Sequence, residues 1–527
     1  MAPRRKRYRD RPTVRRPVEF QVNVDIADSP GTHILAATAG NRLFLWKDKG
    51  KAEAKAEAGK CTTREVDKDQ SATRAPYTCV KMSPCGRYLA SGGEDKVVKL
   101  WKVHVEEERE KGNSEEEEEE ELSCTCVWSA TLPKRPNAFA FSPRSDFLYC
   151  GDKFGEVHCI SVLDPKPKTA KEDDPSGKEK PAANGNDHKE KAMKTKTEAE
   201  DGSVFEAEAT RLLAHFCSTI TSVAVCPQHK FLATADRDRK VRVTCIPQAL
   251  HAQGEEKGKS QPQAMHEIQS YCIGREGFAS NMFFVTSDLL VTAGADGAIT
   301  LWSAAEGKQV DSIQVEEGNL AGEEETSSSA CLASWCYIEK KGLIVTLGES
   351  KKISAVHVNV EEKKLKLWDC QVGSLPTGFL PAKLALSPAS LSGGSSSSSS
   401  SLCSFRIYVA GCVTGKEKEG KLPVSAVMHT LEMSVIQDKP ATTTTCTATW
   451  MGEGEGALSP WANESARPLL MEDRKQYSKL RIVLPDLIKP LFPLDEREFR
   501  KRNTNANTKA KQQHQQQQHQ QQRGVKE

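Results

Sequence analysis

Apolar and polar residues alternate along short segments of this chain, and these segments recur in one plan. Residues 77–103 and 220–246 each contain an alternating segment, a turn with proline, an apolar segment ending in small residues, a charged turn and another alternating segment. Residues 136–162 follow the same plan, and residues 280–302 follow it without the proline. Alternation with a period of two is what a half-buried β-strand requires. The pattern therefore predicts a repeated antiparallel unit.

Particular residue types mark the turns and strand ends of each copy. Proline presets a turn in the backbone, and it follows three equivalent residues, Ser83, Ser142 and Cys226. Aspartate, whose carboxylate can accept backbone N–H groups, occupies one position of the charged turns, as Asp95, Asp238 and Asp296. Tryptophan closes equivalent strands and is expected to bury a large apolar area between neighbouring sheets, as Trp46, Trp101 and Trp302.

Weaker copies at residues 33–47, 331–358 and 405–433 bring the number of units to about seven. The repeats predict an all-β, seven-bladed β-propeller with disordered insertions and tails. Residues 19–25 (EFQVNVD) form a further candidate strand with two interpretations. The strand either pairs with the last blade and closes the ring, which removes an exposed edge, or belongs to the first blade.

Composition divides the chain into a propeller and segments that cannot form a core. Only 37% of the residues are hydrophobic and the mean hydropathy is −0.56, and polar insertions separate the repeats. We expect a basic disordered tail at 1–18, the propeller with disordered inter-blade loops at 19–435, a partly helical C-terminal extension at 436–502 and a Gln-rich disordered tail at 503–527.

The residue patterns of common enzymes are missing from the sequence. It contains no Gly-rich phosphate loop after a strand, no HExxH helix and no GxSxG elbow. The 17 cysteines lack zinc-site spacing, and the histidines are scattered over different units, as expected for surface or structural residues. We therefore expect no metal site, no cofactor and no catalysis. The absence of a signal peptide or long apolar run indicates a reducing compartment and no membrane.

The charged turn within residues 234–243 (TADRDRKVRV) is the strongest local anomaly. It carries more charge than a turn requires, in the residues Asp236, Arg237, Asp238, Arg239, Lys240 and Arg242. One interpretation is a solvated turn with weak internal ion pairs. The other is a docking rim that recognises a partner by charge complementarity. The sequence pattern by itself leaves both open.

Three segments resemble the WD-repeat, non-catalytic subunit of the eukaryotic tRNA (guanine-N7)-methyltransferase, the Wuho-like family. Residues 231–243 (FLATADRDRKVRV) resemble that family's fourth-blade signature, and residues 152–165 (DKFGEVHCISVLDP) resemble the end of its third blade. Residues 270–280 (SYCIGREGFAS) are similar to its link into the next blade, but Arg275 and Ala279 replace the usual His and Val. The resemblance covers residues 31–432.

This resemblance implies a WD40 propeller that is not an enzyme and forms a heterodimer with a catalytic methyltransferase subunit. The partner would bind S-adenosylmethionine and methylate a guanine in the tRNA variable loop, while this chain stabilises the partner and helps position tRNA. Asp236, Lys240 and Arg242 would lie at the partner interface, with Arg242 facing an acidic group. Arg237 and Asp238 would shape the turn and complete the partner-binding site.

The two basic ends of the chain suggest further roles. A basic C-terminal segment could contact tRNA phosphates or only keep the chain soluble; its candidate residues are Arg497, Arg500, Lys501 and Arg502. The basic N-terminus is typical of a nuclear localisation signal, which indicates the nucleus, with the cytoplasm as a second location. The alternative function is a WD-repeat scaffold for a ubiquitin ligase or chromatin complex, and a propeller with catalytic activity is a third.

Overall fold

The structure is a computed structural model of the 527-residue chain. Its described residues are 24–29, 34–39, 42–47, 64–65, 77–106, 121–163, 204–216, 218–247, 264–265, 267–315, 332–348, 352–368, 370–372, 379–387, 401–414, 422–437, 444–450 and 469–471. All of them lie in one compact unit, Met1–Ile482. Among them, no helix has the length and apolar character needed to cross a membrane.

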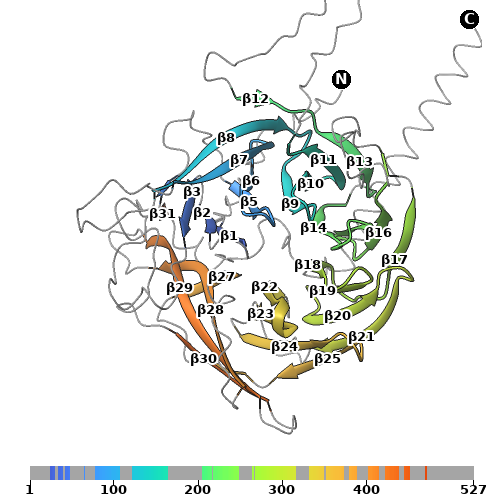
Figure 1. Cartoon of the computed structure of the whole chain (residues 1–527), viewed down its shortest axis with the longest axis vertical. Helices are drawn as coiled ribbons and strands as arrows, with labels where there is room; N and C mark the ends of the chain where they lie inside the picture. The colour runs from blue at the N-terminus through green and yellow to red at the C-terminus, as the bar shows by residue number, and fades with distance from the viewer. Residues whose placement is uncertain are drawn as a thin grey trace, which may run out of the picture. The chain divides into compact units, whose positions relative to one another are not determined.

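The described strands form seven sheets, which we number as blades in chain order (Figure 1). Blade 1 contains β1 (Val24–Ser29), β2 (Ile34–Ala39), β3 (Arg42–Lys47) and β4 (Arg64–Glu65). Blade 2 contains β5 (Tyr77–Met82), β6 (Tyr88–Gly93), β7 (Val97–Glu106), β8 (Glu121–Thr131) and the outer strand β12 (Phe205–Glu206). Blade 3 contains β9 (Pro136–Phe141), β10 (Phe147–Asp152), β11 (Glu156–Ser161) and β13 (Thr210–Ala214).

Blade 4 contains β14 (Ile220–Val225), β15 (Phe231–Asp236), β16 (Val241–Cys245) and β17 (Ile268–Cys272). Blade 5 contains β18 (Ala279–Phe284), β19 (Leu289–Gly294), β20 (Ala298–Ser303) and β21 (Lys308–Gln314). Blade 6 contains β22 (Leu332–Ile338), the 3-10 turn η2 (Glu339–Lys341), β23 (Leu343–Gly348), β24 (Ile353–Asn359) and β25 (Lys364–Trp368). Blade 7 contains β26 (Cys370–Val372), β27 (Phe379–Leu386), β28 (Ser401–Thr414), β29 (Leu422–Gln437), β30 (Thr444–Trp450) and β31 (Leu469–Met471).

The blades form a closed ring through their innermost strands. Each of β1, β5, β9, β14, β18, β22 and β27 contacts the next, and β27 returns to contact β1. Figure 1 shows the same circle of sheets. The core lies between facing blades, where the inward side chains of neighbouring sheets meet. The all-β propeller predicted from the repeats is confirmed. Strands such as β10, β15 and β19 are buried on both faces, as expected where one sheet packs between two others.

The predicted turn chemistry holds, with one addition. Ser142 Oγ accepts the N–H groups of Asp146 and Phe147, both at 3.0 Å, and Cys226 Sγ accepts that of Phe231 at 3.1 Å. The residue before each proline therefore accepts backbone donors and closes the turn between the first two strands. The sequence pattern had indicated only the proline.

The predicted tryptophans are buried where the structure describes their side chains. The indole N–H of Trp101 donates to Ser91 Oγ, and that of Trp302 donates to Thr292 Oγ1, both at 2.9 Å. Each indole is therefore hydrogen-bonded inside its own blade while its ring fills space between sheets. The side chain of Trp46 lies outside the described residues.

The structure decides one open assignment and changes one expected boundary. Val24 and Asp25 pair with Ala39 and Thr38 in blade 1, so the described end of the 19–25 strand is an ordinary first-blade strand. Blade 7 continues past residue 435, because β29 pairs with β30 and β31. The predicted propeller end at 435 is thus too early: β29 needs an outer partner for its backbone groups, and the chain supplies it later.

Candidate partner-docking site

The charged turn predicted from the sequence joins β15 to β16 in blade 4. Antiparallel strands alternate direction, so this turn lies on the same rim as the β10–β11 turn of blade 3 and the connection from β13 to β14. Its backbone is closed by bonds from the Asp236 N–H to the Lys240 carbonyl and from the Arg239 N–H to the Asp236 carbonyl. Arg239 has a positive φ of 69°, a left-handed backbone conformation that residues other than glycine rarely adopt.

Asp236 holds this turn from below. Its side chain is 1% exposed, and His215 Nδ1 donates to its Oδ2 at 2.9 Å. Its Oδ1 accepts the N–H of Lys240 at 3.0 Å. The other ring nitrogen of His215, Nε2, lies 2.8 Å from Thr234 Oγ1, so the histidine is fully hydrogen-bonded. The carboxylate is therefore a buried anchor for the turn.

Neighbouring loops fix the exposed part of the turn from both sides. The N–H of Arg237 donates to the Thr219 carbonyl at 2.9 Å, and that of Asp238 donates to Ser218 Oγ at 3.2 Å. On the blade 5 side, the Arg239 guanidinium donates to the Glu276 carbonyl at 3.1 Å. The turn is thus held in one conformation before any partner arrives, which reduces the entropy lost on binding.

Arg242 lies on β16 behind the turn and is half-buried. Its Nε donates to Thr244 Oγ1 at 3.1 Å, and its guanidinium reaches the Ala214 carbonyl of blade 3 at 3.4 Å. Burial lowers the pKa of this guanidinium, and the neighbouring Tyr271 partly offsets the effect. Thr244 occupies the position where blades 2 and 5 place Trp101 and Trp302. Arg242 therefore lies beside a small residue where those blades have an indole.

The structure separates the five predicted partner-binding residues into layers. Arg237, Asp238 and Lys240 are exposed, Arg242 is half-buried, and Asp236 is buried. Asp236 was expected at the interface itself, yet both of its oxygens are bound inside the blade. Its place is beneath the surface that the other residues form. Arg497, Arg500, Lys501 and Arg502 lie outside the described residues.

Exposed apolar side chains flank this turn, and sequence reasoning missed them. Phe216, in the connection from β13 to β14, is 90% exposed, and Ile273, just after β17, is 71% exposed. Phe154, in the β10–β11 turn, is also exposed, and the ammonium of Lys134 lies 4.3 Å from its ring centroid. The sequence offered only a weak signal for these residues, namely a single apolar residue in a connection between strands. We call the set of Phe154, Phe216, Arg237, Lys240 and Ile273 the docking rim.

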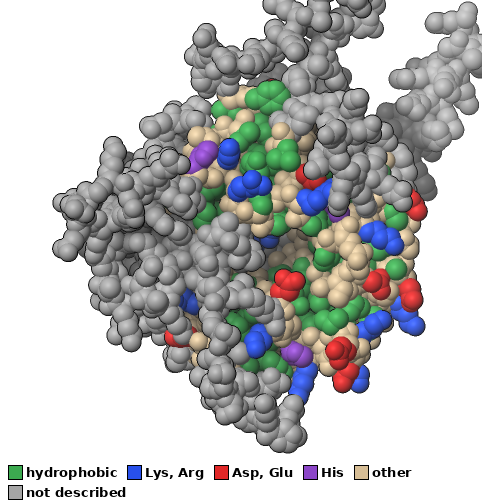
Figure 2. Space-filling model, viewed as in Figure 1, with side chains coloured by type: hydrophobic (Ala, Val, Ile, Leu, Met, Phe, Trp, Pro, Cys, Tyr) green, Lys and Arg blue, Asp and Glu red, His purple; other side chains and the backbone are tan. Residues whose placement is uncertain are grey.

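The molecular surface is mixed in charge. Figure 2 shows lysine, arginine, acidic and hydrophobic side chains interspersed over the described part of one face. A mixed surface favours recognition by specific pairs over a general attraction for polyanions.

Blade 5 explains the arginine at the position where the resembling family usually has histidine. The Arg275 guanidinium donates to Thr292 Oγ1 at 2.6 Å and to the Ala298 carbonyl at 3.0 Å, and it pairs with Asp296. Thr292 in turn receives the indole N–H of Trp302. Arg275 thus does in blade 5 what His215 does in blade 4, and its role is structural.

This chain is similar to several known proteins. A curated relative from Aspergillus clavatus, named "tRNA (guanine-N(7)-)-methyltransferase non-catalytic subunit trm82", is 23% identical over 62% of this chain and 68% of its own length. One from Coccidioides immitis, with the same name, is 26% identical over 58% of this chain, which spans only 57% of that relative. The solved structure titled "Crystal structure of RRP9 WD40 repeats" has a TM-score of 0.46 at 14% identity, covering 76% of this chain and 90% of the other.

A family model described as "tRNA methyltransferase TRM82 WD40 domain" matches residues 27–372, more than half of the chain. The matched range includes the charged turn, His215 and Arg275. The chain therefore belongs to the family of the TRM82 WD40 domain of tRNA methyltransferase.

Proposed function

We propose that this chain is the non-catalytic subunit of a heterodimeric tRNA (guanine-N7)-methyltransferase and that the docking rim binds the catalytic subunit. The names of its relatives support the first half of this proposal. The observation that supports the second is an exposed cationic turn fixed on a buried carboxylate–imidazole pair.

The chemistry of the rim suits a folded protein partner. Arg237 and Lys240 supply exposed positive charge for acidic groups, and Phe216 and Ile273 supply apolar area that water covers poorly. Binding energy at protein interfaces concentrates in a few buried aromatic and arginine residues surrounded by polar contacts. The methyltransferase partner would bind S-adenosylmethionine, and this chain would stabilise it and help position tRNA, with the basic segment around Arg497 in contact with phosphates. The basic N-terminus supports a nuclear location, with the cytoplasm as a second one.

The first test is the identity of the partner. The tagged chain is purified from its own cells, and its stable partners are identified by mass spectrometry. In cells that lack the chain, N7-methylguanosine in tRNA is then measured. We expect a methyltransferase and a decrease in the modified nucleoside. A ubiquitin ligase or chromatin subunit in its place, with unchanged tRNA, would establish the alternative scaffold function. Methyl transfer by the purified chain alone would contradict a non-catalytic role.

The second test locates the interface. Lys240→Glu reverses an exposed charge on the docking rim, and Lys308→Glu makes the same change at an exposed position of β21 in blade 5. We expect Lys240→Glu to weaken partner binding about tenfold or more and Lys308→Glu to leave it within about twofold. Equal effects of the two substitutions would place the interface elsewhere.

A further inference from the structure

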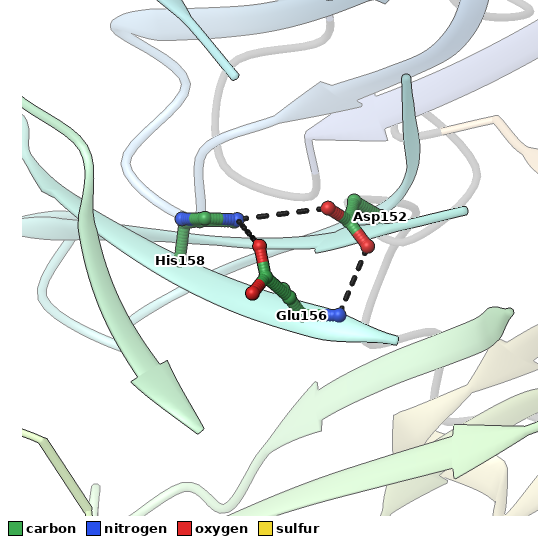
Figure 3. A group of neighbouring side chains, drawn as sticks. All are labelled: Asp152, Glu156 and His158. Carbon is green, nitrogen blue, oxygen red and sulfur yellow. Dashed lines mark hydrogen bonds and ion pairs between the residues drawn. The ribbon is translucent and has the colours of Figure 1, made fainter. Parts of the chain in front are cut away.

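Blade 3 brings together three side chains that can bind a metal ion. Asp152 ends β10, Glu156 begins β11, and His158 follows two residues later on the same strand. One ligand atom from each lies within 4.8 Å of the others. Nε2 of His158 is 3.7 Å from both Asp152 Oδ2 and Glu156 Oε2. Figure 3 shows the three side chains pointing toward one another. These separations are too long for hydrogen bonds.

Two of the three side chains are buried and carry polar atoms that make no hydrogen bond within the described part of the chain. The His158 side chain is 4% exposed and the Asp152 side chain is 0% exposed. Neither ring nitrogen of His158, nor Oδ2 of Asp152, makes a hydrogen bond to any described residue. A buried polar group without a partner costs roughly 1–3 kcal/mol, more if it is charged. Such a group calls for a ligand that satisfies it.

One oxygen of each carboxylate is held by hydrogen bonds, and the other oxygen of each points toward the histidine. Asp152 Oδ1 accepts the N–H groups of Phe154 and Glu156 at 2.8 and 2.9 Å. Glu156 Oε1 accepts from the exposed Arg211 guanidinium at 2.8 Å, so Oε2 remains for the site. Bonds of this kind orient ligating carboxylates in metalloproteins.

Blade 4 has the same spacing with different chemistry. There the aspartate is Asp236, and the residues four and six positions later are Lys240 and Arg242. Asp236 is satisfied by His215 at 2.9 Å. Blade 3 therefore replaces two cations by a carboxylate and an imidazole, and its aspartate faces the imidazole of its own sheet.

We propose that Asp152, Glu156 and His158 bind a first-row divalent transition-metal ion, with Zn²⁺ as the representative. Tetrahedral zinc with ligand bonds of about 2.0–2.1 Å places its ligand atoms about 3.3 Å apart. The histidine lies 3.7 Å from each carboxylate oxygen and all three ligand atoms lie within 4.8 Å of one another, so they would have to approach by about 1.5 Å at most. Three protein ligands leave one position for water. The imidazole favours Zn²⁺ over Mg²⁺ and Ca²⁺, which prefer oxygen ligands alone.

A metal ion here would brace the loops behind the docking rim. The N–H of His215 donates to the Gly155 carbonyl at 2.8 Å, and Thr219 Oγ1 donates to the Lys153 carbonyl at 2.9 Å. Both acceptors lie in the turn between Asp152 and Glu156. The metal site does not depend on the proposed function. Only the coupling between the metal site and docking rests on the proposed function.

The test adds Zn²⁺ alone to the chelator-treated full chain and follows thermal unfolding. We expect one equivalent to bind and the unfolding midpoint to rise by about 3 °C at a Zn²⁺ concentration one hundred times the Kd. Mg²⁺ at the same concentration should cause no shift. Glu156→Gln and His158→Phe should abolish the zinc shift, whereas the matched control Glu306→Gln should retain it.

A double variant and a cobalt spectrum separate this site from other zinc ligands. His514→Gln with His519→Gln removes the tail imidazoles, and the shift should persist. Co²⁺ bound in place of Zn²⁺ should show weak visible bands without thiolate charge transfer, which excludes cysteine ligation. No zinc shift in the unmodified chain, or an undiminished shift in Glu156→Gln, would overturn the proposal, even if His158→Phe fails to fold.

Discussion

Replacing Asp236 by alanine removes the carboxylate that anchors the charged turn. The substitution deletes the acceptor of two hydrogen bonds, from His215 Nδ1 at 2.9 Å and from the Lys240 N–H at 3.0 Å. Both donors are then left without this partner beneath the turn. Hydrogen bonds to charged groups contribute about 1.5–3 kcal/mol each, and breaking a buried pair costs about 3–5 kcal/mol. We expect the free energy of unfolding to fall by about 3–5 kcal/mol.

Chemical denaturation of the purified chain measures this loss, and two variants control it. Asp238→Ala removes an exposed carboxylate two residues away and should change the unfolding free energy by less than about 0.5 kcal/mol. Asp236→Asn keeps a side-chain oxygen that can accept from Lys240, so its loss should be smaller than that of alanine.

Partner binding distinguishes an anchoring role from a direct contact. With Asp236 as an anchor, loss of stability and loss of partner affinity should occur together in Asp236→Ala. A loss of less than about 1 kcal/mol in stability would refute the reasoning from the buried pair. Full stability with abolished partner binding would place the carboxylate at the interface, as the sequence alone had suggested.

Two further substitutions and one pH profile test separate features. Arg242→Glu should weaken partner binding by about 2–5 kcal/mol in calorimetric titration, because it reverses a half-buried charge; an unchanged Kd with the chain still folded would contradict this. Arg275→Ala should lower the free energy of unfolding by about 3–5 kcal/mol, since it breaks the buried ion pair with Asp296 and removes the guanidinium bond to Thr292. If the free energy of unfolding falls by less than about 1 kcal/mol, the guanidinium does not stabilise blade 5 as argued. Burial raises the pKa of the Cys85 thiol, but hydrogen bonds to Ser145, Ser83 and Arg87 outweigh it and lower the pKa to about 7. Its alkylation rate, followed by mass spectrometry, should therefore rise as pH increases through 7 and level off above it, and a half-maximum near the ordinary thiol value of about 8.5 would refute this.

The fold could be predicted from the sequence because its determinants are local. Each blade is encoded by alternation over a few residues and by short turns, three of which carry a proline, and these signals act within one hairpin. The same signals were weakest at the ring's ends. They left the role of residues 19–25 open and ended the propeller at 435. The strands β30 and β31 lack the repeat pattern, and their pairing with β29 becomes visible only in the folded sheet.

The candidate site was only half accessible to the sequence. The excess charge between Asp236 and Arg242 marked the turn that we propose for docking, but the sequence pattern did not distinguish the buried from the exposed members of the five residues. Their layering depends on His215, which lies 21 residues earlier in the chain and reaches Asp236 only when the sheet forms. The exposed apolar residues of the docking rim gave almost no signal, because a single phenylalanine in a connection has no periodicity.

The sequence by itself determined the repeating antiparallel unit, the turns and the family resemblance, because these depend on neighbouring residues. Only the tertiary structure decided that Asp236 is an anchor, that Arg275 bonds Asp296 and Thr292, and that Asp152, Glu156 and His158 lie together. Those outcomes depend on which side chains face one another, on burial and on whether a polar atom finds a partner. Such quantities exist only once separate strands have been brought together.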